Sequence, residues 1–246
     1  MHRIPPSYSF DVFDTVLTRT VLHPMDIFLL MQQRIPSVTV EIDPQIIRSF
    51  WGWRVWSEFV ARRQSRCEDI DLDSIYTVFA RLCALDDKAR DALQQLELQV
   101  ESETLIPIKG AVELLHDCRF RSNHGIVFVS DMYLPSAFIQ SVLERHDLFH
   151  TGDRLYVSGV QGVTKGSGGL FRLLLNQLAI QPSDLTHYGD NRNADYLVPR
   201  SLGIGILKEP TRKGRGLRYA RLSDSLGYLR KLIQARICIA GGNYYV

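Results

Sequence analysis

Short apolar segments alternate with helical patterns along most of this chain, and this alternation constrains the fold more than any other feature. The apolar segments cover residues 8–11, 125–131, 154–159, 186–190 and 203–207, and each but the last ends on Ser, Asp or Gly. Strands that alternate with helices are typical of parallel βαβ units. We therefore predict an α/β fold with a doubly wound parallel sheet.

Residues 21–104 interrupt the alternation directly after the first predicted strand. They contain helical stretches, and a strand pattern is suggested only in SVTVEI, residues 37–42. In the last stretch Leu93, Leu96 and Val100 form an apolar stripe that suits one buried face. We expect residues 1–20 and 105–207 to form the α/β core, residues 21–104 an inserted α-helical cap, and residues 208–246 a basic C-terminal tail.

Charge and composition argue against several classes of protein. The formal net charge of +2 gives no strong case for a nucleic-acid partner. The chain has no run of about 18 apolar residues and its start has no apolar signal-peptide core, so we expect neither a membrane span nor export. The four cysteines are scattered without a CxxC pair, which indicates reduced thiols and a cytoplasmic location.

The basic tail allows two interpretations. Nine of the residues from 208 to 236 are Lys or Arg. Such a stretch can bind an anionic lipid, a nucleic acid or an acidic partner. We favour a solvated linker towards another module or protein.

Polar side chains stand at the ends of the predicted strands. A buried carboxylate is costly unless it is paired or binds a metal, so an aspartate that ends the first apolar run suggests a site. Ligands of doubly wound sheets bind beyond the carboxyl ends of the strands, where these residues should converge. They are Asp11 with Thr15, Ser130, Lys165, and Asp190 with Asp195.

This set of residue types matches the needs of phosphoryl transfer. A carboxylate that attacks a phosphate must overcome repulsion between two anions, which a divalent ion bridging both would lower. A lysine and a hydroxyl can hold the remaining phosphate oxygens. An aspartyl-phosphate intermediate would divide one difficult hydrolysis into two easier steps. The hard oxygen ligands favour Mg²⁺ as the cofactor.

The order of these motifs resembles the haloacid dehalogenase-like (HAD) superfamily. FDVFDTVL is similar to its first motif, Ser130 to its second, Lys165 to its third and GDNRNAD to its fourth, over residues 8 to about 207. That superfamily places a helical cap between motifs one and two. More closely, SFDVFDT, SDMYLP and GDNRNAD resemble HAD hydrolases found beside or fused to bacterial glycosyltransferases.

The resemblance implies a role for each matching residue. Asp11 would be the nucleophile and a Mg²⁺ ligand, joined by the Phe13 carbonyl and Asp190. Ser130 and Lys165 would bind phosphate. Asp195 would support Lys165 or the metal site.

Further candidates near these motifs have ordinary alternatives. Thr15 is a substrate-binding candidate. Asp131 lines the pocket or caps the helix that follows it, and Asn191 reaches the substrate, orients Asp190 or serves as a turn residue. For His187, beside the fourth motif, we favour a core or supporting role over catalysis.

One departure from the family pattern concerns the acid/base residue. Phosphatases of this superfamily usually carry a second Asp two residues after the nucleophile, where this chain has Phe13. Asp14, one residue later, could replace it, but we favour an Asp14 that hydrogen-bonds the turn or pairs with Arg19. Without general acid–base help, worth about 10²–10⁴-fold, fast phosphomonoester hydrolysis is in question.

The sequence thus favours a Mg²⁺-dependent hydrolase acting on a small phosphomonoester, such as a sugar phosphate. The alternative is a catalytically weak or inactive HAD module that binds a phosphorylated ligand or a partner enzyme in polysaccharide assembly. Phe13 favours this alternative, whereas Asp11, Lys165 and Asp190 oppose it. A dehalogenase ranks third, because those enzymes do not need the metal pair.

Overall fold

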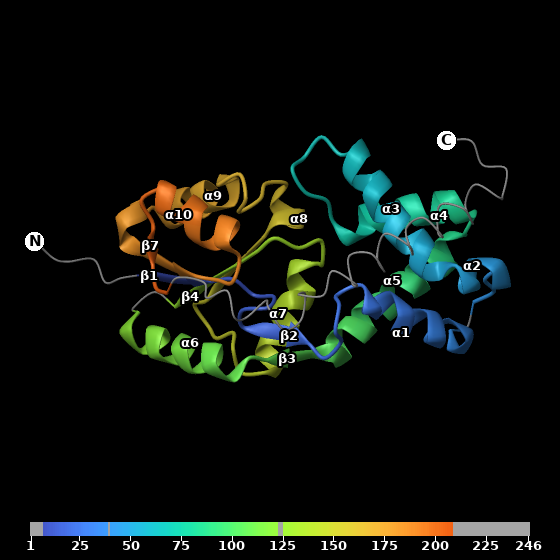
Figure 1. The fold of residues 1–246 in the computed structure, drawn as a ribbon, viewed down its shortest axis with the longest axis horizontal. Helices are drawn as coiled ribbons and strands as arrows, with labels where there is room; N and C mark the ends of the chain where they lie inside the picture. The colour runs from blue at the N-terminus through green and yellow to red at the C-terminus, as the bar shows by residue number, and fades with distance from the viewer. Residues whose placement is uncertain (1–6, 39, 123–124, 209–246) are drawn as a thin grey trace, which may run out of the picture. The chain divides into compact units, whose positions relative to one another are not determined.

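The chain forms two compact units in the computed structural model, which describes residues 7–38, 40–122 and 125–208 (Figure 1). An α/β unit comprises residues 7–20, 66–71 and 105–208. A helical unit comprises residues 21–65 and 72–104. Of the predicted tail, residues 208–246, only Lys208 is described; residues 209–246, with Cys238, lie outside the described part.

A five-stranded parallel sheet forms the centre of the α/β unit, in the order β5-β4-β1-β6-β7. The strands are β1 (Ser7–Phe10), β4 (Ile126–Ser130), β5 (Arg154–Val157), β6 (Leu185–Tyr188) and β7 (Gly205–Ile206). The order reverses at β1, so the prediction of a doubly wound sheet is confirmed.

Helices cover both faces of this sheet. Figure 1 shows α9 (Gly169–Leu178) and α10 (Val198–Ser201) on one face and α6 (Lys109–Arg121) on the other. The remaining helical elements are α7 (Ser136–Arg145), α8 (Ser158–Gln161), the 3₁₀ turn Pro182–Asp184 and the π-helix Arg192–Leu197.

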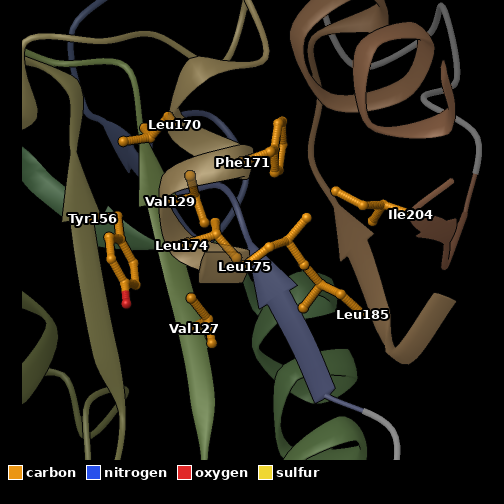
Figure 2. Close-up of a cluster of buried hydrophobic side chains, with 9 residues drawn as sticks. All are labelled: Val127, Val129, Tyr156, Leu170, Phe171, Leu174, Leu175, Leu185 and Ile204. Carbon is orange, nitrogen blue, oxygen red and sulfur yellow. The ribbon is translucent and has the colours of Figure 1, made fainter. Parts of the chain in front are cut away.

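The apolar core between α9 and the sheet explains why the strand segments are so apolar. Figure 2 shows Leu170, Leu174 and Leu175 of α9 packed against Val127 and Val129 of β4. Strands covered on both faces need apolar side chains on both faces. Polar residues inside such strands are therefore exceptions that call for partners.

A small antiparallel ladder, not predicted from the sequence, joins the two ends of the insertion. It pairs β2 (Leu17–Arg19) with β3 (Leu105–Pro107), and Leu17 lies opposite Pro107. This ladder fixes the point where the chain leaves the α/β unit next to the point where it returns.

The described residues of the insertion form helices and short turns. Its helices are α1 (Asp26–Arg34), the 3₁₀ turn Ile35–Ser37, α2 (Pro44–Arg48), α3 (Phe50–Gln64), α4 (Leu72–Cys83) and α5 (Asp87–Thr104). The stripe of Leu93, Leu96 and Val100 is buried. The described residues of 37–42 form no strand, since Ser37 ends a 3₁₀ turn.

A buried ion pair lies in the core of the helical unit. Arg54 is fully buried, and its Nε and Nη2 donate to the two carboxylate oxygens of Glu97 at 2.7 and 2.8 Å. Its guanidinium carbon lies 4.5 Å from the centroid of the Phe28 ring. This bidentate geometry compensates both buried charges.

The segment Arg66–Asp71, between α3 and α4, belongs to the α/β unit. Nothing in the periodicity of the insertion singles it out. No helix in the described part of the chain is long and apolar enough to cross a membrane.

Candidate active site

Asp11 stands directly after β1, the central strand. Its backbone N–H donates to the Tyr188 carbonyl at 2.9 Å, which continues the ladder between β1 and β6. The residue is only 5% exposed. One carboxylate oxygen accepts from the Thr15 hydroxyl at 2.8 Å and the other from the Lys165 ammonium at 2.5 Å. Its partners therefore hold Asp11 in one orientation at the carboxyl end of the sheet.

A tight turn after Asp11 presents Thr15 to it. Asp14 adopts a left-handed conformation with φ 58°, and its N–H donates to the Leu17 carbonyl at 2.7 Å. The Asp14 carboxylate accepts from the Thr18 hydroxyl at 3.0 Å. This hydrogen bond within the turn agrees with the favoured, non-catalytic interpretation of Asp14.

The Phe13 ring contacts the guanidinium of Arg19. The half-buried ring lies 4.9 Å from the guanidinium carbon of Arg19. The position where the resemblance leads one to expect the acid/base carboxylate is thus occupied by a cation–π contact.

Lys165 connects three carboxylates. Its ammonium donates to Asp11 at 2.5 Å and to Asp195 at 2.6 Å, and its backbone N–H donates to Asp131 at 2.8 Å. The residue is 3% exposed. Burial opposes its charge, but Asp11, Asp195 and Asp131 together hold the pKa of Lys165 above its ordinary value. Lys165 therefore stays charged at the centre of the site.

Asp11, Asp190 and Asp195 form a carboxylate cluster. Each offers an oxygen, and these oxygens all lie within 4.8 Å of one another. Burial raises the pKa of Asp11 to about 7, and the charges of Asp195 and Asp190 add to the rise while Lys165 opposes it. Three carboxylates beside one ammonium leave an excess of negative charge that a divalent cation would compensate.

Asp195 is held by Lys165, His187 and Asn191. Both of its oxygens already accept from the protein, one from Lys165 and His187 and the other from the Asn191 N–H at 2.8 Å. A Cβ on Gly189 would lie 2.4 Å from the Asp195 carboxyl carbon, so glycine is needed there.

The other predicted residues differ in their surroundings. Ser130 ends β4 and is buried, on the same sheet edge as Asp11. Asp131 is exposed; it holds the backbone of Lys165, and among the described residues no side chain caps the start of α7. The Asn191 side chain accepts from the N–H groups of Asn193 and Ala194, so it caps the π-helix.

The segment Arg66–Asp71 supplies two carboxylates that sequence reasoning missed. One Glu68 oxygen accepts from the N–H and hydroxyl of Thr164 and from the hydroxyl of Ser167, at 2.6 to 3.0 Å. Asp69 accepts from the fully buried Ser158 hydroxyl at 2.5 Å. The pairings attach the segment to the first residue of α8, which follows β5, and to the loop that carries Lys165. Acidic residues in a break between two helices were the available signal.

Comparison with known proteins identifies the fold. No family model matches the chain, and no curated protein matches its sequence. Among solved structures, YfnB of Bacillus subtilis, a HAD hydrolase described with bound magnesium, is 16% identical with a TM-score of 0.54 over 83% of this chain and 88% of its own.

Two further solved structures agree. The HAD-family enzyme BT-2542 of Bacteroides thetaiotaomicron is 11% identical with a TM-score of 0.54, over 85% of this chain and 95% of its own. A HAD phosphatase of Thermococcus onnurineus is 18% identical with a TM-score of 0.51, over 82% and 84%. At such identities the likeness shows the fold, and this chain has the α/β fold of HAD hydrolases.

Proposed function

We propose that this chain is a Mg²⁺-dependent phosphohydrolase of the HAD type, in which Asp11 attacks a small phosphomonoester. The observation that carries the proposal is the buried Asp11 carboxylate, held by Thr15 and Lys165 within 4.8 Å of two further carboxylates. Solved structures of BT-2542, which shares the fold, contain magnesium and inorganic phosphate and support this proposal.

The residues divide the work of the reaction. An Asp11 oxygen forms a bond to phosphorus while the ester P–O bond breaks, and the alcohol leaves with a proton from solvent. Water then attacks the aspartyl phosphate, which releases inorganic phosphate and restores Asp11. Lys165 and the Ser130 hydroxyl hold phosphate oxygens as charge shifts.

Asp11, Asp190 and the Phe13 carbonyl would hold Mg²⁺. The bound ion supplies charge that reduces the repulsion between carboxylate and phosphate. The sugar-phosphate substrate, the cap role of residues 21–104, and a glycosyltransferase or polysaccharide-pathway partner belong to the same proposal, on the strength of the sequence resemblance.

The second candidate is a module that binds a phosphorylated ligand without turning it over. Phe13 under the Arg19 guanidinium favours it, because the usual position of the acid/base has no carboxylate. The two candidates share the metal and phosphate ligands and differ only in turnover.

A panel of phosphomonoesters assayed with Mg²⁺ and with chelator separates the two. Asp11→Asn should abolish turnover, because an amide is a poor nucleophile. It should keep the melting temperature, because Lys165 retains Asp195 and the repulsion of Asp11 by Asp195 and Asp190 is lost. The matched control is Asp117→Asn, on the exposed surface of α6, which should keep full activity. Mg²⁺-dependent phosphate binding without turnover would favour the binding module. Full activity in Asp11→Asn would reject the proposed nucleophile.

A further inference from the structure

Two polar residues inside neighbouring strands lie directly behind the proposed site. Ser9 of β1 and His187 of β6 are register partners, and both are fully buried. The Ser9 hydroxyl lies 2.8 Å from His187 Nδ1, and His187 Nε2 lies 3.2 Å from a carboxylate oxygen of Asp195. The ring edge of His187 packs on Phe171, with ring centroids 5.0 Å apart. Polar groups in a parallel strand are costly unless they are paired.

The hydrogen-bonding roles in this chain follow from its chemistry. Asp195 is ion-paired with the Lys165 ammonium at 2.6 Å, and a carboxylate in such a pair can only accept. His187 Nε2 must then carry a proton. A neutral ring with that proton accepts from the Ser9 hydroxyl at Nδ1.

The chain of contacts ends on the Lys165 ammonium. The Asp195 oxygen that accepts from His187 also accepts from Lys165 at 2.6 Å. Rotation of that carboxylate would therefore move the ammonium away from Asp11, to which it donates at 2.5 Å.

We propose that His187 is a positioning residue: Ser9 fixes its tautomer, and its Nε2–H holds Asp195 in the orientation that places Lys165 on Asp11. This role rests on the proposed function for its effect on turnover, but the hydrogen-bond geometry does not depend on it. His187 touches neither substrate nor metal in this role, so it is not a catalytic residue.

Two substitutions of similar volume separate positioning from packing. His187→Gln retains a donor that can reach Asp195, whereas His187→Leu retains the bulk against Phe171 and removes the donor. Hydrolysis of para-nitrophenyl phosphate should fall in His187→Leu by about 10–100-fold, the usual loss when the partner that orients a site residue is removed. In His187→Gln it should stay within a few-fold of the wild type.

Melting temperatures provide the control. Removal of the imidazole leaves the buried Ser9 hydroxyl without this partner, so activities are compared well below the melting temperature of each variant. Equal activity in the two folded variants would overturn the positioning role.

Nuclear magnetic resonance tests the geometry irrespective of turnover. The ¹⁵N shifts of His187 at pH 7 should report the Nε2–H tautomer, and Ser9→Ala should weaken that preference. The ¹⁵Nζ resonance of Lys165 should shift in His187→Leu and stay in place in His187→Gln. An Nδ1–H tautomer, or a Lys165 resonance unchanged in both variants, overturns the inference, whereas a wild type without phosphatase activity contradicts only the proposed function.

Discussion

Replacement of Phe13 by aspartate tests what the site lacks. General acid–base help is worth about 10²–10⁴-fold. The new carboxylate would lie near the Arg19 guanidinium, whose carbon is 4.9 Å from the present ring centroid. Such a neighbour lowers the pKa of an aspartate by roughly 1–3 units, and each unit reduces its protonated fraction at neutral pH about tenfold. The acid–base contribution has a midpoint of about 10³-fold, and the loss of protonated fraction has a midpoint of about 10²-fold. The expected net gain in rate is therefore about tenfold.

The assay compares two leaving groups. The wild type should hydrolyse para-nitrophenyl phosphate, whose leaving group needs no proton, much faster than glycerol phosphate. In Phe13→Asp, kcat/KM for glycerol phosphate should rise about tenfold and that for the aryl ester should scarcely change. Phe13→Asp with Arg19→Gln should gain more, towards about 10³-fold, because the depressing charge is gone.

Three outcomes would refute this reasoning. Equal gains on both esters would mean that the new carboxylate does not act on the leaving group. No gain on glycerol phosphate in a double variant that melts like Arg19→Gln alone would mean that position 13 cannot supply the acid. Loss of glycerol phosphate hydrolysis in Asp14→Asn, with the aryl ester spared, would identify Asp14 as the acid.

Three further predictions concern stability and reactivity. Burial raises the pKa of Cys83 to about 12, so its thiol should resist alkylation at pH 8 in the folded chain. The exposed Cys67 should react, and peptide mass mapping would show the difference. Rapid labelling of Cys83 would contradict its burial. Glu97→Gln should destabilise the helical unit by about 3–5 kcal/mol in urea unfolding, because Arg54 loses its fully buried counter-charge and retains Glu58, which is partly exposed. A loss under about 1 kcal/mol would show that Glu58 suffices. Lys165→Met should lower the melting temperature without metal and increase the stabilisation by Mg²⁺, since Asp11 and Asp195 lose the ammonium that they share. An unchanged Mg²⁺ response would argue against a shared site.

The sheet and the edge where the site lies could be predicted because each depends on a local pattern. Strands covered on both faces are mostly apolar, so the polar residues that follow them stand out, and parallel strands bring these ends together. Asp11, Lys165 and Asp195 accordingly meet within hydrogen-bonding distance. The ladder between β2 and β3 was missed because strands this short have too little alternation to recognise.

The supporting contacts could not be predicted, because they join residues that are distant in the chain. Ser9 and His187 are separated by 178 positions, and Asp69 and Ser158 by 89. A serine or histidine within a strand has no periodicity that indicates its partner. For Asn191, capping and substrate binding could likewise not be separated from the sequence, because the choice depends on where the Asn193 and Ala194 N–H groups lie.

The assignment of Arg66–Asp71 to the α/β unit limits how the insertion can be exchanged between proteins. In the described part of the chain, the helical unit consists of two separate pieces, residues 21–65 and 72–104. Excision of residues 21–104 at a single pair of junctions would also remove Asp69 and leave the buried Ser158 hydroxyl without this acceptor, a loss of about 1–3 kcal/mol. A chimaera that exchanges all of residues 21–104 would place Glu68 and Asp69 of one protein beside an α/β unit from another protein. Exchange of residues 21–65 and 72–104 alone leaves Arg66–Asp71 in place and keeps each native pairing.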